Sequence, residues 1–191
     1  SLHDAQERVT VPGFYNKVRL MEDWERQALA EIPFDEAEYA QGFGTVMRGE
    51  AGFSTNERRW FRPTLECNGI FGGYTGEGSK TIVPALATAK FSARLVADQD
   101  PQEVMDCLRQ YFESYQQPGV QIEFVPGDCS KPYILAREGA GERIFGAASR
   151  AVEAGFGRLP LLCRNGGAIG VVADFERVLH APTLLLGLGS P

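Results

Sequence analysis

Residues 68–104 constrain the fold of this chain more than any other stretch. They contain a glycine-rich loop, a polar Ser-Lys-Thr sequence, an extended segment and the start of a helix. Polarity alternates near the end of the extended segment. One face of the expected strand carries Phe91, Ala93 and Leu95, and the other carries Lys90, Ser92 and Arg94. Because successive strand side chains point to opposite faces, one face should pack on a core while Arg94 lies on the polar face.

The helix that follows has a clear start signal. Asp100 is a favourable N-cap, Pro101 suits the first helical position, and Glu103 lies three residues after the cap. An apolar stripe at helical spacing consists of Val104, Leu108, Tyr111, Phe112 and Tyr115. After a Pro-Gly turn, residues 120–125 alternate again and predict another strand. This order favours a small α+β sandwich whose sheet has one solvated face.

Helical spacing also predicts elements upstream of this stretch. Residues 22–31 are expected to form a helix, with Trp24, Leu29 and Ile32 as candidates to face inward. Further short helices are expected after Asp35 and at residues 57–61, and a strand is expected at residues 64–68.

The C-terminal part has a different character. A loop-like sequence after Gly127 predicts a domain boundary near residue 130. Beyond it we expect a helix over residues 144–155, a strand at 160–163, a glycine turn leading into a helix, and an apolar strand at 183–186. Strand, helix and strand make a βαβ unit. Two strands are too few for an independent domain, so this part is interpreted as a fragment of a larger sheet.

Composition excludes several classes of function. A formal net charge of −6 argues against a nucleic-acid surface, which needs clustered Lys and Arg. No apolar run has the length of a membrane span. The four cysteines are scattered without a CxxC pair, which favours a reduced cytoplasmic setting over a disulfide framework or zinc cage. The only histidines, His3 and His180, are too few for a histidine-rich metal site.

The glycine-rich loop invites a phosphate-binding interpretation, which its spacing contradicts. A phosphate loop places lysine directly after its second glycine, but Ser79 separates Gly78 from Lys80. Such a loop must also open a helix, and residues 82–84 are Ile-Val-Pro. A dinucleotide fingerprint fails because residue 81 is threonine. The simplest alternative is that these glycines only permit tight turns.

Residues 62–104 (RPTLECNGIFGGYTGEGSKTIVPALATAKFSARLVADQDPQEV) resemble a known domain. They are similar to the lid, or dimerisation, domain of the zinc-dependent exopeptidases that include carnosine-type dipeptidases, acetylornithine deacetylases and carboxypeptidase G, and most of all to the dipeptidase branch. Three further segments support this, RVTVPGFYNKV, RNGGAIGVVADFERVL and TLLLGLG. The resemblance implies a ferredoxin-like lid at residues 1–130, an antiparallel four-stranded sheet with two helices whose first strand is missing. Residues 131–191 would be the C-terminal fragment of the α/β catalytic domain.

The resemblance also implies a metallopeptidase mechanism, with two zinc ions, a bridging water and a glutamate base. The family's metal ligands lie in an HxD segment, an aspartate, an EE pair and a further acid upstream, and in a histidine beyond the last glycine-rich strand. His3 and His180 match none of these positions. This chain is therefore expected to supply no catalytic residue and no metal ligand.

Two side chains correspond to substrate-binding positions of the family. Arg94 corresponds to an arginine that grips the substrate's C-terminal carboxylate, and a guanidinium suits that role because it forms two parallel hydrogen bonds with a carboxylate. The alternative is a solvated strand arginine. Thr81 corresponds to a threonine that contacts the substrate, and its alternative role is that of a turn residue.

The turn at residues 165–168 corresponds to a substrate loop usually written GGSIP or GSTIP. Backbone N–H groups of Gly166, Gly167 and Ala168 are expected to hold a carboxylate at a helix start. Ala168 lacks the family's hydroxyl, and Gly170 replaces the proline. These departures put substrate specificity and full activity in question.

Our first hypothesis is a fragment of a cytoplasmic zinc dipeptidase or aminoacyl amidohydrolase. Its parent would act on dipeptides or short acyl-amino acids and form a homodimer through the lid, without nucleic-acid or membrane partners. A second hypothesis is a non-catalytic dimerisation or interaction module that keeps the lid fold. A third is a nucleotide-binding protein. Intact HxD and EE segments upstream would favour the enzyme over the module.

Overall fold

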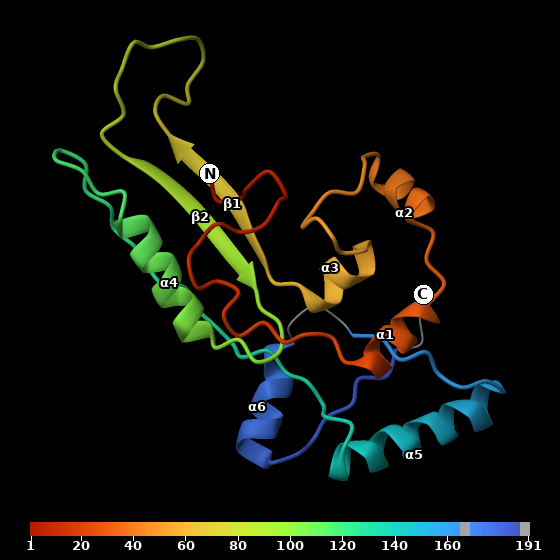
Figure 1. The fold of residues 1–191 in the computed structure, drawn as a ribbon. Coiled ribbons are helices and arrows are strands. Elements are labelled where there is room, and N and C mark those ends of the chain that lie inside the picture. The colour runs from red at the N-terminus through yellow and green to blue at the C-terminus, as the bar shows by residue number, and fades with distance from the viewer. Residues whose placement is uncertain (165–168, 188–191) are drawn as a thin grey trace.

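The computed structural model describes residues 1–164 and 169–187 and is drawn in Figure 1. Along the chain it contains α1 (Asp23–Ala30), α2 (Glu36–Phe43), α3 (Thr55–Phe61), β1 (Thr64–Gly72), β2 (Ala87–Arg94), α4 (Pro101–Glu113), α5 (Gly139–Phe156) and α6 (Gly170–Leu179). None of the helices in these ranges is long and apolar enough to cross a membrane.

The central element is an antiparallel hairpin made of β1 and β2. Its register runs from the pair Thr64 and Arg94 at one end to the pair Gly72 and Ala87 at the other, with an irregularity between Cys67 and Gly69. The predicted strand at residues 64–68 therefore continues to Gly72. A long loop at residues 73–86 joins the strands and projects away from the helices (Figure 1).

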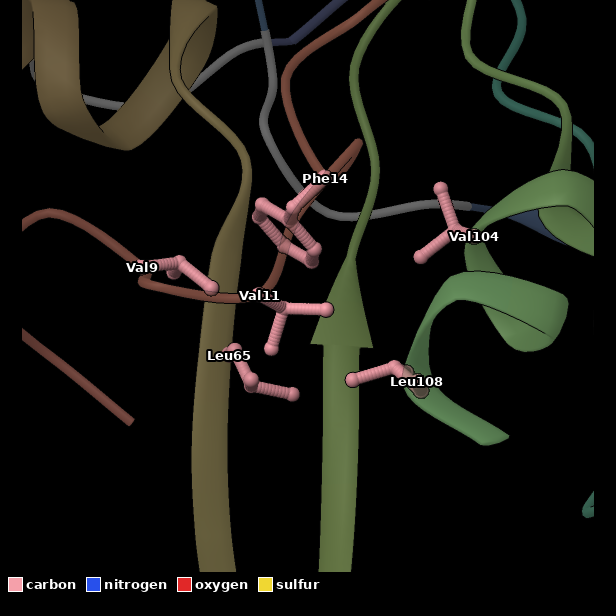
Figure 2. Packing of buried hydrophobic residues seen from close by; sticks show 6 residues of the cluster. All are labelled: Val9, Val11, Phe14, Leu65, Val104 and Leu108. Carbon is pink, nitrogen blue, oxygen red and sulfur yellow. The ribbon is translucent and has the colours of Figure 1, made fainter. Parts of the chain in front are cut away.

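The hydrophobic core lies at the end of the hairpin opposite this loop. It consists of Val9, Val11, Phe14, Leu65, Val104 and Leu108. Figure 2 shows that these side chains come from the N-terminal segment, β1 and α4, and that Val11, Leu65 and Leu108 point into the same space. The N-terminal segment and α4 therefore fix the hairpin at one end.

The alternation predicted for β2 is confirmed. Phe91, Ala93 and Leu95 are partly buried against the core, whereas Arg94 is exposed. Successive side chains of a strand point to opposite faces, so the apolar side chains of β2 all lie on the face that α4 covers.

The start of α4 is also as predicted. The Asp100 carboxylate accepts hydrogen bonds from the backbone N–H groups of Gln102 at 2.9 Å and Glu103 at 3.4 Å. Val104 and Leu108 are buried. Tyr115 differs from the prediction, because the helix ends at Glu113 and the Tyr115 ring is 52% exposed.

The strand predicted at residues 120–125 is wrong. Apart from an isolated bridge between Gln117 and Val120, this segment pairs with no strand among the described residues. Instead Phe124 packs against Phe112, and Arg109 stacks over the Phe124 ring at 4.9 Å. A strand needs a hydrogen-bonding neighbour, and this segment lies against a helix instead. The sheet of the described chain thus has two strands rather than the three expected of a lid without its first strand.

The predicted βαβ unit is reduced to its helix. Residues 160–163 and 183–186 form no strand, whereas α6 occupies the expected place between them. Parallel strands are stable only inside a sheet that supplies paired neighbours and covering layers. The described residues of this part provide helices but no such sheet. The helix expected at residues 144–155 is present and begins earlier, as α5.

Leu65 provides a test of the core. It is 2% exposed, so Leu65→Ala should remove buried contacts and lower the free energy of unfolding by about 2–5 kcal/mol. Urea unfolding followed by circular dichroism measures this change. Leu20→Ala is the control, since Leu20 is 82% exposed and its truncation should cost about 1 kcal/mol or less. Equal losses for the two variants would contradict this placement of the core.

Candidate functional site

Arg94 lies at the last position of β2, at the edge of an open cleft of about 930 Å³. Two other parts of the chain contribute to the cleft. The N-terminal turn supplies His3, Asp4 and Glu7, and α3 with the residue that follows it supplies Arg58, Arg59 and Arg62. Arg94 is therefore exposed at a concave, charged surface rather than on an isolated strand face.

Several charges of this cleft neutralise one another. Arg62 forms two hydrogen bonds with the Glu50 carboxylate, both at 2.7 Å, and Arg48 donates to Glu7 at 2.7 Å. Within residues 1–164 and 169–187, Arg94 has neither an ion pair nor a side-chain hydrogen bond. Its guanidinium is consequently open to an anion from outside these segments.

Thr81 lies far from Arg94 along the hairpin. It is exposed in the loop of residues 73–86, which leaves the ladder at Gly72 and Ala87. Arg94 lies seven positions after Ala87, and at a rise of about 3.4 Å per residue the two are about 24 Å apart. Figure 1 shows the loop directed away from the Arg94 end. The structure does not bring Thr81 and Arg94 together within one chain.

The third set of predicted substrate residues, Gly166, Gly167 and Ala168, lies outside the described residues. The helix expected after this turn is present, because α6 begins at Gly170. On the other side of the turn, Arg164 is held by contacts that sequence patterns did not predict.

The most buried charged side chain of α1 is Glu25, whereas Trp24, Leu29 and Ile32 are only partly buried. The Glu25 residue is 2% exposed. Its carboxylate accepts hydrogen bonds from the backbone N–H of Glu22 at 2.8 Å, from Arg19 at 2.7 Å and from Arg164. Glu22 and Glu25 also form the capping box of α1. That three-residue spacing marks the helix start in the sequence, but the two arginines come from elsewhere.

These contacts set the protonation of Glu25. Burial raises the pKa of the carboxyl group, but the backbone N–H of Glu22, the Arg19 hydrogen bond and the charges of Arg164 and Arg19 outweigh burial and hold that pKa below its usual value. Burial in turn lowers the pKa of Arg164, and Glu25 opposes that effect. Both groups are charged at neutral pH, and each compensates the burial of the other.

The described residues do not suit a metal ion. In the two described ranges, no three His, Cys, Asp or Glu side chains gather closely enough to hold one. We therefore assign no metal-dependent step to side chains of these ranges. These residues offer an exposed guanidinium in a cleft and a hairpin whose loop lies far from it.

Comparison with protein families identifies the domain to which the hairpin and its covering helix belong. The family described as "Peptidase dimerisation domain" matches residues 9–120. The chain belongs to this family.

Individual relatives extend the similarity over the whole chain. A Cys-Gly metallodipeptidase of Candida albicans is 29% identical over 99% of this chain and 39% of its own length. The human Beta-Ala-His dipeptidase is 26% identical over 100% of this chain and 38% of its own length. The chain thus spans about two fifths of these metallodipeptidases and corresponds to a part of them.

Solved structures show the same fold. A metallo-carboxypeptidase from Sulfolobus solfataricus superposes with a TM-score of 0.74 at 26% identity, over 92% of this chain and 39% of the other. Human carnosine dipeptidase 1 gives 0.74 at 25% identity, over 94% of this chain and 38% of the other. The implied lid fold is therefore confirmed as an antiparallel hairpin with helices, although the lid strand predicted at residues 120–125 is absent from the described chain.

The lowered pKa of Glu25 predicts a pH dependence of stability. A carboxyl whose folded pKa is depressed stabilises the fold above its unfolded pKa, and that stabilisation is lost as the pH falls through and below the usual 4.5. Glu25→Gln should therefore be less stable than the unmodified chain at pH 7, and the difference should shrink below pH 4.5. Urea unfolding at a series of pH values measures it. Glu31→Gln, at the exposed C-terminal end of α1, is the control and should show no such trend.

Proposed function

We propose that this chain is the substrate-gripping and dimerising part of a zinc-dependent dipeptidase or aminoacyl amidohydrolase. Residues 1–130 would form most of the lid, and residues 131–191 the C-terminal piece of the catalytic domain. The supporting observation is the exposed guanidinium of Arg94 at the cleft of a chain whose relatives are metallodipeptidases. The two zinc ions and the glutamate base would be supplied by segments outside this chain.

In this proposal Arg94 binds the C-terminal carboxylate of the substrate. A guanidinium presents two N–H groups in the geometry of a carboxylate, and the bonds are strengthened because both partners are charged. The position favours such a role because Arg94 lies directly beside the buried core, which holds the end of the strand in place. Its backbone is therefore fixed before the ligand arrives.

Thr81 takes part in a different way. A dipeptide is far shorter than the roughly 24 Å between the two ends of the ladder. Thr81 and Arg94 of one chain therefore cannot contact the same small substrate in this conformation. We propose that Thr81 serves the substrate site of a second copy, so that two chains together complete each site. The backbone of Gly166, Gly167 and Ala168 remains a proposed carboxylate contact of the catalytic part.

The distal half of the hairpin supports a homodimer. It carries large apolar side chains that are exposed in the single chain, namely Ile70, Phe71, Tyr74, Ile82, Val83 and Leu86. Val83 is 94% exposed. Apolar groups gathered on a projecting hairpin are costly in water and favour association with another protein surface. A second copy would cover them and also bring Thr81 to its partner's site.

A cytoplasmic location is part of the proposal. All four cysteines, Cys67, Cys107, Cys129 and Cys163, are free thiols. Free thiols without a disulfide framework are typical of reducing compartments.

A second candidate function is a non-catalytic dimerisation module. The exposed hairpin favours it as well, and so do Ala168 and Gly170, which depart from the substrate loop of the family. The two functions differ in one measurement. The full-length protein, assayed with zinc, should hydrolyse dipeptides such as Cys-Gly or Beta-Ala-His if it is the enzyme, and should form dimers without hydrolysis if it is the module.

Arg94→Ala tests the carboxylate contact in the full-length protein. Loss of a charge-assisted pair should cost roughly 2–4 kcal/mol of transition-state binding, which lowers kcat/KM about 30-fold to 1,000-fold. Lys90→Ala is the matched control, because Lys90 is an exposed cation on the same strand and face. An unchanged kcat/KM in Arg94→Ala, or an equal loss in Lys90→Ala, would refute the assignment.

Val83→Glu tests the dimer. A charge at the most exposed apolar position of the hairpin would be buried unpaired in the proposed interface, which should raise the dimer dissociation constant by at least about tenfold. Sedimentation velocity over a range of concentrations measures this constant. Val125→Glu is the control, since Val125 is 75% exposed but lies outside the hairpin. A dimer that survives Val83→Glu unchanged would exclude the hairpin as its interface.

A further inference from the structure

Arg164 connects the C-terminal part of the chain to α1. Its guanidinium donates to the Glu25 carboxylate, 139 residues earlier in the sequence. The Glu25 side chain is 1% exposed and that of Arg164 is 19% exposed, so the contact is largely removed from water. On another side, the Arg164 guanidinium lies over the ring of Phe61, at the end of α3, at 4.9 Å.

Little else fixes the backbone around Arg164. Residues 158–164 belong to no helix or strand, and their backbone groups make no backbone hydrogen bond to other described residues. Leu161 and Cys163 are exposed. Among the described residues, the side chain of Arg164 therefore makes the polar attachment of this segment, alongside the partly buried Pro160 and Leu162. The charged partner of Arg164 is the Oε1 atom of Glu25, which Arg19 also contacts at 2.7 Å.

We propose that Glu25 is a positioning residue. By holding Arg164, it fixes residues 158–164, which lead to residues 165–168. Glu25 itself touches no substrate and acts only through Arg164. The consequence for catalysis rests on the function proposed above, in which that turn binds a substrate carboxylate. The fixation of residues 158–164 by Glu25 does not depend on that function.

Glu25 suits this task better than an exposed acid would. A buried carboxylate with one arginine removed leaves an unbalanced charge, so the pair is costly to open. Arg19 donates to Oε1 and the backbone N–H of Glu22 donates to Oε2, so the carboxylate is held in one orientation, and Arg164 shares Oε1 with Arg19. A neutral glutamine would keep the shape and lose the charge.

Trypsin reports directly on the contact. The enzyme must take the arginine side chain into its pocket, so Arg164 is protected while Glu25 holds it. Arg158, six residues earlier, is exposed and serves as the internal reference. In Glu25→Gln we expect the ratio of cleavage after Arg164 to cleavage after Arg158 to rise at least about tenfold, because proteolysis follows the population of the open form. Mass spectrometry of early time points measures the ratio.

Two further variants make the test specific. Glu22→Gln removes the other carboxylate that contacts Arg19, at 2.5 Å, and leaves the pair of Glu25 and Arg164 intact, so the ratio should not change. Glu25→Asp keeps the charge and should restore part of the protection. General unfolding of a variant would also raise the ratio, but it would raise cleavage after Arg109 inside α4 as well, so cleavage after Arg109 must stay unchanged for the ratio to report local release.

In the full-length protein, Glu25→Gln should raise KM for a dipeptide about tenfold and change kcat by less than about twofold, because the turn would bind the substrate less well in the ground state and the transition state alike. An unchanged cleavage ratio overturns the inference. A raised ratio with unchanged KM in an active enzyme overturns the positioning role and leaves a structural contact. If the protein hydrolyses no dipeptide, the proposed function fails, and the cleavage ratio alone decides whether Glu25 fixes this segment.

Discussion

The packing of the N-terminal segment and α4 against one end of the hairpin is the contact on which the rest of the structure depends. Six buried side chains make up this core, and Phe14 and Leu65 lie at its centre. A two-stranded hairpin is marginally stable alone, so its strands persist here because apolar side chains on one face are covered. The buried amide of Gln99 strengthens this attachment, since it donates to the backbone oxygen of Phe14 at 2.8 Å.

An attachment at one end divides the hairpin into two regions. Near the core, the backbone of Arg94 is held in place and its guanidinium reaches the cleft. At the other end, the loop of residues 73–86 and its apolar neighbours lie free of the core (Figure 1). A binding site for a small substrate that used both regions would take one region from each of two chains. The separation between them is fixed by the rise of the strands and not by any side chain.

A second attachment is electrostatic and joins the C-terminal part to α1. Glu25 is buried with Arg19 and Arg164, and Arg137 stacks over Trp24 at 4.8 Å beside it. Hydrophobic packing holds the hairpin, whereas charge and cation–π contacts hold the segment before residues 165–168. Charge pairs of this kind are specific in direction, because each hydrogen bond requires a donor and an acceptor in line. Such contacts hold a segment in a defined position, whereas hydrophobic burial alone only shields it from water.

Local patterns in the sequence determined β2, with Arg94 on its polar face, and α4 with its Asp100 cap, because strand period and capping depend on neighbouring residues alone. They also carried the resemblance that the family match confirmed. Only the tertiary structure decided that residues 120–125 are not a strand, that Glu25 rather than Trp24 is buried, and that Thr81 lies far from Arg94. Each of these depends on a partner distant in sequence: a neighbouring strand, an arginine 139 residues away, or the length of a ladder. No local pattern records such a partner.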